Sequence, residues 1–215
     1  MKIVFQGISL HLVSQETLED LRQIRNRASE MGFMIDRNPI SSESQQRWYN
    51  NLDRTLNFFF LIESGGENIG VGHITAINYQ AQTAECGLYL TNEQYNGTQV
   101  SVLSSLVLLF LVFEIFKLEE LKAKVLVENT VAKAYNIRLG FQFMGNIDAD
   151  AIWMTLSKEQ YQKQSKKLLS KLLKNGVIQI GDNMQSDNPT LWKAVELFQI
   201  NTDSSQIELE VHQGK

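Results

Sequence analysis

Cysteine and histidine are scarce in this 215-residue sequence, which has one cysteine, Cys86, and three histidines. A single cysteine excludes a disulfide within the monomer and suits a reducing compartment. It also has no neighbouring histidine in sequence to activate it, so we expect no cysteine nucleophile. His11, His73 and His212 are scattered, and no acidic pair stands at ligand spacing with them. The sequence therefore predicts no metal site.

Positive charge and long apolar runs are also limited. The formal net charge of −4 gives no basis for predicting nucleic-acid binding, which usually requires a basic field. The most apolar segment, Val100–Phe116, falls just short of a membrane-spanning length and contains Glu114 and three serines, so we expect a buried helix. Residues 1–13 show no secretory signal, because polar residues interrupt their short apolar run and no small-residue cleavage site follows. We expect a cytoplasmic protein with no membrane or nucleic-acid partner.

An alternation of strand and helix patterns organises the middle of the chain, from Thr83 to Phe141. The segment Thr83–Leu90 has the pattern of a strand, and a loop, the apolar helix, a second strand and a shorter amphipathic helix follow it. This order predicts a βαβ unit. The loop before the apolar helix would point unpaired N–H groups at one spot, which suits an anion such as phosphate. Gly97 in that loop would let the backbone approach a ligand closely.

Further elements are predicted on both sides of this unit. Strands are expected at Ile3–Val13, Asn57–Glu63, Ile69–Asn78, Phe143–Ile147 and Ala151–Leu156, and helices at Glu16–Met31, from Ser41 or Ser42 through Leu52, and at Lys158–Lys174. Three antiparallel strands followed by a βαβ unit predict an α/β protein with a mixed sheet.

Residues 175–215 are predicted to form a C-terminal extension to a domain of residues 1–174. The extension contains a strand pattern at residues 177–180, a helix starting at Pro189 and a strand pattern at Ile207–Val211. These elements could cover the sheet, build a homodimer contact or shape an acceptor pocket, and the sequence leaves all three open.

The loop Gln94-Tyr95-Asn96-Gly97-Thr98-Gln99 resembles the pyrophosphate loop of the GNAT superfamily of N-acetyltransferases, Gln/Arg-x-x-Gly-x-Gly/Ala, and departs from it at Gln99. Asn129 after the next strand, Ala132 and the Gly140-Phe141 helix stop also fit that family's spacing. Upstream, Arg25-Asn26, the stretch from Ile40 to Trp48 and Ile69-Gly70 are similar to the branch that acetylates small molecules, sugar nucleotides or protein N-termini. The resemblance covers Ile8 to Ser157, about two-thirds of the chain.

The resemblance implies a mixed, mostly antiparallel central sheet of six to seven strands flanked by helices. It also implies acetyl-CoA as the co-substrate. The cofactor-binding residues would be Leu88, Leu90, Gln94, Tyr95, Asn96, Gly97, Thr98, Gln99 and Asn129. Backbone N–H groups near Leu88–Leu90 would stabilise the thioester oxygen as it becomes negative.

Two further catalytic roles involve Glu85, Tyr135 and Asn136. Glu85 is a candidate base for the amine, directly or through water, and the alternative is a solvent-facing charge. The family's usual proton donor, a tyrosine, corresponds to Asn136 here, and Tyr135 lies about 100° away around the helix. Either a rotated helix presents Tyr135 to the leaving thiolate, or solvent protonates it.

Acceptor contacts are predicted at Arg25, Trp48 and Tyr49. Arg25 or Arg27 could bind an anionic group of the acceptor, and the alternative is a solvated helix face. Trp48 and Tyr49 could line the acceptor site or pack between helix and sheet. The sequence predicts an acetyl-CoA-dependent N-acetyltransferase acting on a primary amine of a small molecule, with an amino sugar or its nucleotide as the first candidate. Protein N-terminal acetylation and a non-catalytic acyl-CoA-binding module are the alternatives.

Overall fold

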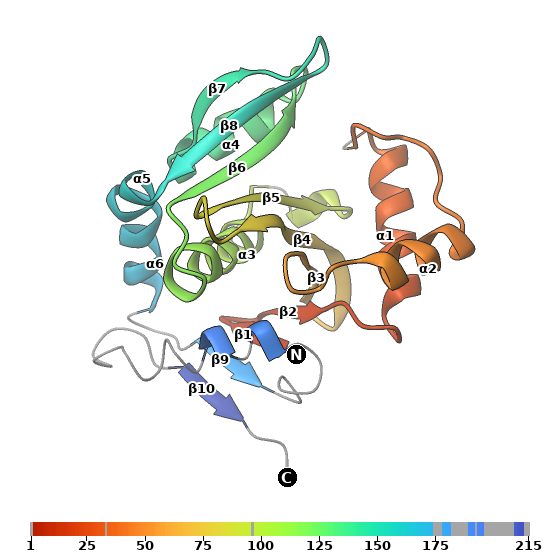
Figure 1. Ribbon diagram of the computed structural model, residues 1–215, viewed down its shortest axis with the longest axis horizontal. Coiled ribbons are helices and arrows are strands. Elements are labelled where there is room, and N and C mark those ends of the chain that lie inside the picture. Colours follow the sequence, from red (N-terminus) through yellow and green to blue (C-terminus); the bar gives the residue numbers. More distant parts are fainter. Residues whose placement is uncertain are drawn as a thin grey trace.

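The computed structural model describes residues 2–32, 34–95, 97–173, 178–181, 189–191, 193–195 and 209–212. The strands of these residues form one sheet in the order β10-β9-β1-β2-β3-β4-β5-β6-β8-β7 (Figure 1). The β5–β6 and β9–β10 pairs are parallel and the other neighbours are antiparallel. The predicted mixed, mostly antiparallel sheet is therefore confirmed, but the predicted count of six to seven strands is wrong, because the described residues form ten.

The strands are β1 Lys2–Phe5, β2 Ile8–Leu12, β3 Phe58–Ser64, β4 Glu67–Asn78, β5 Thr83–Leu90, β6 Glu120–Leu126, β7 Gln142–Asn146, β8 Ala151–Ser157, β9 Ile178–Gly181 and β10 Leu209–His212. The helices are α1 Leu18–Glu30, α2 Ser42–Asn51, α3 Gln99–Phe110, α4 Thr130–Leu139, α5 Lys158–Lys163 and α6 Ser165–Leu173, with a 3₁₀ turn η1 Glu93–Tyr95 and a π-helical turn η2 Leu111–Ile115.

The segment predicted as one strand at Ile3–Val13 is a hairpin of β1 and β2. Gln6 and Gly7 form its two-residue turn, with φ of 47° and 83°, and Phe5 pairs with Ile8 across it. A turn with two positive φ angles matches the right-handed twist of the strands, so the chain reverses here instead of continuing.

The C-terminal segment supplies the strands β9 and β10. In the described part of this segment, β9 pairs with β1 and β10 pairs with β9, at the lower edge of the sheet in Figure 1. Ile178, Ile180, Leu191 and Val195 are buried in the main core. The segment therefore covers the core, which is one of the three roles left open by the sequence.

Side chains alternate between two hydrophobic layers, one on each face of the sheet. Phe58, Phe60 and Ile62 of β3 join the main core with α3, whereas Leu61 packs with Leu21 of α1. In Figure 1, α1 and α2 lie on one side of the central strands, and α3 and α6 lie on the other. The apolar segment Val100–Phe116 is therefore buried, as predicted, and within the described residues no helix is long and apolar enough to cross a membrane.

The helix predicted at Lys158–Lys174 is interrupted, so this prediction is wrong in detail. Gln164 departs from helical geometry, with φ −117° and ψ −74°, and separates α5 from α6. Ser165 is buried and donates a hydrogen bond to the Leu139 carbonyl at 2.5 Å, while Tyr161 stacks on Phe113. Both residues therefore face the core on either side of the break.

Candidate active site

The parallel strands β5 and β6 pair at one end only. Their register runs from Thr83 opposite Glu120 to Cys86 opposite Ala123, although β5 continues to Leu90 and β6 to Leu126. In the same stretch β5 stays paired with β4 up to Gly70 opposite Leu90. Figure 1 shows β6 rising with β7 and β8 away from β5. The sheet therefore splits beside residues 87–90, and one edge of β5 is left open there.

The amide groups at this open edge belong to Leu88 and Leu90. The Thr91 N–H donates to the Ile69 carbonyl of β4 at 2.8 Å. Because successive amides of a strand face opposite edges, those of Leu88 and Leu90 face away from β4, towards the split. The backbone donors that the sequence predicts for an oxyanion are therefore directed into the split, where they remain predicted ligands.

Helix α3 follows β5 after a loop that contains the 3₁₀ turn η1. Thr98 is the N-cap residue, but its hydroxyl donates to the Tyr95 carbonyl at 2.7 Å and no side chain caps the helix. The hydroxyl of Ser101 likewise donates backwards, to the Thr98 carbonyl at 2.9 Å. Within the described residues, the backbone N–H groups of the first turn of α3 therefore have no side-chain hydrogen-bond acceptor. This arrangement favours binding of an anion at this end of the helix.

The remaining loop residues differ in what the structure describes. Gly97 adopts φ +70°, a conformation that favours glycine, and Tyr95 is partly buried against the core. Gln94 is exposed, and Asn96 lies outside the described residues. Gln99 is the position where the sequence departs from the family pattern. Its side-chain Nε2 donates a hydrogen bond to the side-chain oxygen of Gln6 at 3.4 Å, so this side chain points towards the β1–β2 turn.

Asn129 ends the loop after β6 and caps α4. Its side-chain oxygen accepts a hydrogen bond from the Ala132 N–H at 2.9 Å. Its Nδ2 donates no hydrogen bond among the described residues, and the residue is half-buried. The side chain can therefore cap the helix and still offer an amide donor to a ligand.

Tyr135 and Asn136 face different neighbours. The Tyr135 hydroxyl lies 3.0 Å from the Ser101 carbonyl and 2.8 Å from the Ser105 hydroxyl, so it joins α4 to the start of α3. Asn136 instead donates through Nδ2 to the Met154 sulfur of β8 at 3.8 Å. Burial raises the pKa of Tyr135 to about 12, against the hydrogen bonds to Ser105 and Ser101, which lower it.

Glu85 is held by an ion pair across β5 and β6. Its carboxylate lies 3.2 Å from the Lys124 ammonium, which also sits 4.7 Å from the centre of the Trp153 ring. Lys124 is the first residue of β6 beyond the paired register. The carboxylate is partly exposed at the start of the split, so it remains a candidate base that would act with Lys124 beside it.

A row of rings crosses the sheet face beneath α1 and α2 and ends at β5. Trp48 packs edge-on against Phe59, with 4.9 Å between the ring centroids, and Phe59 stacks on His73, with 5.5 Å between the ring centroids. The His73 ring lies against Gly87, where an added Cβ would approach Nε2 to 2.3 Å. Gly87 is thus the position where this row meets the strand that borders the split.

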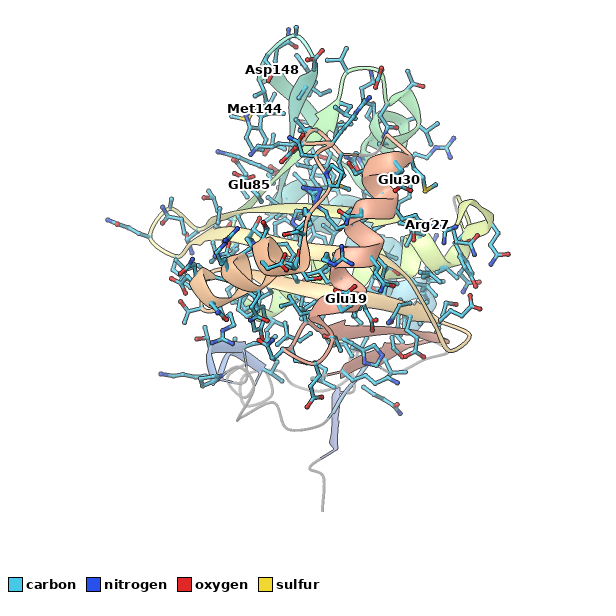
Figure 2. All side chains as sticks on the ribbon, turned by 90° about the vertical axis from the view of Figure 1, so that its right-hand side faces the viewer. Glu19, Arg27, Glu30, Glu85, Met144 and Asp148 are labelled. Atoms are coloured by element: carbon cyan, nitrogen blue, oxygen red, sulfur yellow. The ribbon has the colours of Figure 1, made fainter. Side chains whose placement is uncertain are left out.

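The predicted acceptor residues lie on this same face. Trp48 is half-buried in the row of rings, whereas Tyr49 is buried in the smaller hydrophobic layer and accepts a hydrogen bond from Arg54. Arg25 is half-buried on α1. Figure 2 looks onto this face, with α1 in front of the strands and the exposed Arg27 and Glu30 on its outer sides.

Comparison with solved structures finds proteins of similar fold. A spermidine N-acetyltransferase from Vibrio cholerae, in complex with CoA and spermine, superposes with a TM-score of 0.64 at 18% identity, over 73% of this chain and 98% of its own. FdhC, a nucleotide-linked sugar GNAT, superposes with a TM-score of 0.65 at 19% identity, over 79% of this chain and 97% of its own. The chain has the GNAT fold. No protein-family model matches the sequence, and no curated protein matches it.

The split between β5 and β6 lies in the part of the chain on which the resemblance to the GNAT superfamily rested. The chain order of β5, the loop, α3, β6 and α4 is the order on which the resemblance rested, so the sequence-based fold prediction is confirmed. The individual roles of the site residues stay predictions.

Three residues of the site were not predicted as functional from the sequence. The Nδ1 of His73 is enclosed and has no hydrogen-bond partner among the described residues. Burial, and then the charges of Arg25 and Lys124, lower the pKa of His73 to about 4, so the ring is neutral at pH 7. Tyr89 and Lys124 border the same split, and only the strand register reveals this.

Two other chemistries find no support in the described part of the chain. No group of three or more His, Cys, Asp or Glu side chains there could hold a metal ion. Burial raises the pKa of the Cys86 thiol to about 12, so the thiolate needed for nucleophilic attack is not populated at neutral pH.

We expect Asn129→Ser to separate capping from ligand binding. Serine is as good a cap as asparagine, so the unfolding free energy should change by less than about 0.5 kcal/mol, whereas Asn129→Ala should cost about 1 kcal/mol. If the free Nδ2 donates to the cofactor, both variants should lose roughly 5- to 10-fold in acetyl-CoA affinity by calorimetry. Retained affinity in Asn129→Ser would leave the side chain with its capping role alone.

We expect Tyr135→Phe to affect stability more than turnover. Losing the contacts to Ser101 and Ser105 should cost about 1 kcal/mol in unfolding free energy. A tyrosine with a pKa near 12 is a poor acid for a thiolate whose conjugate thiol has a pKa near 8.5, so kcat should fall less than about 3-fold. A loss of about 100-fold in kcat, with disappearance of an alkaline limb in the pH profile, would instead identify Tyr135 as the acid.

The pKa of Tyr135 also predicts a stability effect at high pH. It is higher in the folded protein than the value near 10 of an exposed tyrosine. The folded state therefore holds this proton more tightly, and the stabilisation is fully present below pH 10 and is lost as the pH rises towards 12. In Tyr135→Phe that contribution to the alkaline decline should be absent from denaturant titrations.

Proposed function

We propose that the protein transfers an acetyl group from acetyl-CoA to a primary amine of a small molecule. The observation that carries this proposal is the split between β5 and β6 beside the uncapped start of α3. The anionic pyrophosphate of acetyl-CoA would accept hydrogen bonds from the amides of the loop at Gly97–Gln99. The thioester arm would then extend into the split, past Asn129 and the open edge of β5.

The chain's own groups can support each step of the reaction. The Leu88 and Leu90 amides would donate to the thioester oxygen as the neutral amine adds to the carbonyl carbon. Glu85 would take the amine proton, directly or through water, at the α1 and α2 side of the sheet. The C–S bond then breaks, and solvent returns a proton to the CoA thiolate, because Asn136 cannot serve as an acid and Tyr135 is held as a weak one.

A non-catalytic acyl-CoA-binding module is the second candidate, and one observation favours it. Asn136 occupies the place where the resemblance implies a tyrosine, and it faces Met154 rather than a free edge. A binder would use the same loop and split without needing a proton donor.

Acetyl-CoA binding and free CoA release are the measurements that separate these readings. Calorimetry with CoA and acetyl-CoA tests the cofactor site, and we expect binding in the micromolar range or tighter. Release of CoA thiol on adding amino sugars, amino-sugar nucleotides, amino acids, polyamines or peptides tests the transfer. Binding without release for any amine would favour the module, and absence of binding would refute the proposed function.

A further inference from the structure

Arg25 lies in the stripe of α1 that faces the sheet. The buried residues of this helix are Leu18, Leu21, Ile24, Ala28 and Ser29. Arg25 follows Leu21 by four residues and precedes Ala28 by three, so it lies on the same side of the helix. Arg27 falls on the opposite side and is exposed. A position that the helical pattern would assign to an apolar residue is thus occupied by a guanidinium.

The guanidinium of Arg25 has no partner within the described residues. Three other basic side chains around this face have a carboxylate within 3.2 Å: Arg22 pairs with Glu19, Arg37 with Glu128 and Lys124 with Glu85. Arg25 is half-buried and makes no hydrogen bond or ion pair there. Hydrogen bonds from Asn38, and then the charge of Arg25, lower the pKa of the exposed Asp36 carboxyl, but no ion pair joins this carboxyl to Arg25 within the described residues. Its planar fork of donors is suited to a carboxylate or a phosphate, and leaving it unpaired in a partly buried place is unfavourable.

Other polar groups on this face also lack partners. The Ser29 hydroxyl, one turn after Arg25 on the same stripe, and the Nδ1 of His73 are buried without a hydrogen bond among the described residues. The charge of Arg25 acts on both His73 and Tyr89, whose pKa values burial shifts to about 4 and about 12. Arg25 thus shares the sheet-facing side of α1 with these unpartnered groups, on the face of the sheet that carries His73.

We infer that Arg25 binds an anionic group of the acceptor, so that the acceptor is a small amine that also carries a carboxylate or a phosphate. This inference rests on the proposed acetyl transfer and specifies the substrate class of the same site. A polyamine does not fit, because Glu85 is already neutralised by Lys124 and Arg25 would face the cationic chain.

Calorimetry with matched ligand pairs tests the inference without requiring turnover. The pairs are D-glucosamine 6-phosphate with D-glucosamine, and an α-amino acid with its amide, each titrated into the CoA-saturated protein, with spermidine as a separate ligand. We expect the member of at least one pair that carries the carboxylate or phosphate to bind about 10- to 100-fold more tightly than the member that lacks it, as charge-assisted hydrogen bonds provide. Equal binding within both pairs, or tightest binding of spermidine, would overturn the inference.

Arg25→Gln and Arg27→Gln form the matched variants. Arg25→Gln should abolish the preference for the ligand that carries the carboxylate or phosphate, and the affinity for the ligand that lacks it should stay within about 2-fold. Arg27→Gln should retain the preference. Equal effects of the two variants would assign the preference to the general field and refute a role for Arg25. The affinity for CoA, measured first, should be unchanged in both, so a failure of the cofactor site is detected separately from a failure of the acceptor site.

Discussion

Gly97→Val should lower the affinity for CoA about 10- to 100-fold, the range expected when charge-assisted hydrogen bonds to an anion are lost. Gly97 holds φ +70°, and no protein atom described there lies within 4 Å of the position of an added Cβ. A β-branched residue would be strained at that φ and would place its methyl groups where the pyrophosphate approaches the loop amides. The strain alone should cost about 1–2 kcal/mol in unfolding free energy.

Gly65→Val provides the control for that strain. Gly65 lies in the turn between β3 and β4 with φ +62°, and an added Cβ there also meets no atom within 4 Å. It should lose similar stability and keep full CoA affinity by calorimetry. If both variants weaken CoA binding alike, or if Gly97→Val binds CoA normally while folded, the phosphate does not lie at this loop.

Gly70→Ala should destabilise the protein by about 3 kcal/mol, at the upper end of overpacking effects. An added Cβ would lie 2.3 Å from the Tyr89 carbonyl oxygen and 3.0 Å from the Leu90 Cα. These are backbone atoms of β5, so relief requires β4 and β5 to separate at the end of the strand that borders the split. Displacing the Leu88 and Leu90 amides by even 1 Å should lower kcat about 100-fold.

Gly72→Ala, two residues along β4, is the comparison. Its Cβ would approach the Leu108 Cδ1 to 2.7 Å, and that atom is the end of a side chain that can change rotamer. We expect about 1 kcal/mol of destabilisation and nearly normal turnover. Chemical denaturation and steady-state rates measure both variants, and equal effects of the two substitutions would argue against a special role for the end of β5.

Much of the fold was predictable from local pattern. The β5 strand at Thr83–Leu90 has the predicted bounds, and α2 begins after Ser41, whose hydroxyl accepts the Ser44 N–H as a helix cap. Asn129 is the N-cap of α4 and Gly140 is its C-cap, so this helix begins and ends where the sequence placed it. Such features depend on a few adjacent residues, through alternation, caps and turn conformations, so they can be derived without knowing the rest of the chain.

The errors arose where distant segments compete. The β1–β2 turn at Gln6-Gly7 interrupts what local alternation presents as one strand, because pairing with β3 and β9 favours two short strands. The helix is also broken at Gln164, and beyond the break Ser165 donates a hydrogen bond to the Leu139 carbonyl of α4. Neither interaction is encoded within a window of neighbouring residues.

The sequence by itself determined the order of strand, loop and helix around Gly97, and with it the fold, whereas the anion site at this loop stays a prediction. Only the tertiary structure decided the side-chain contacts around the site. Tyr135 donates a hydrogen bond to Ser105 of α3, Lys124 pairs with Glu85, and Arg25 lies unpaired within the described residues. These contacts depend on strand register and helix rotation, which are set by packing across the whole sheet rather than by spacing along the chain.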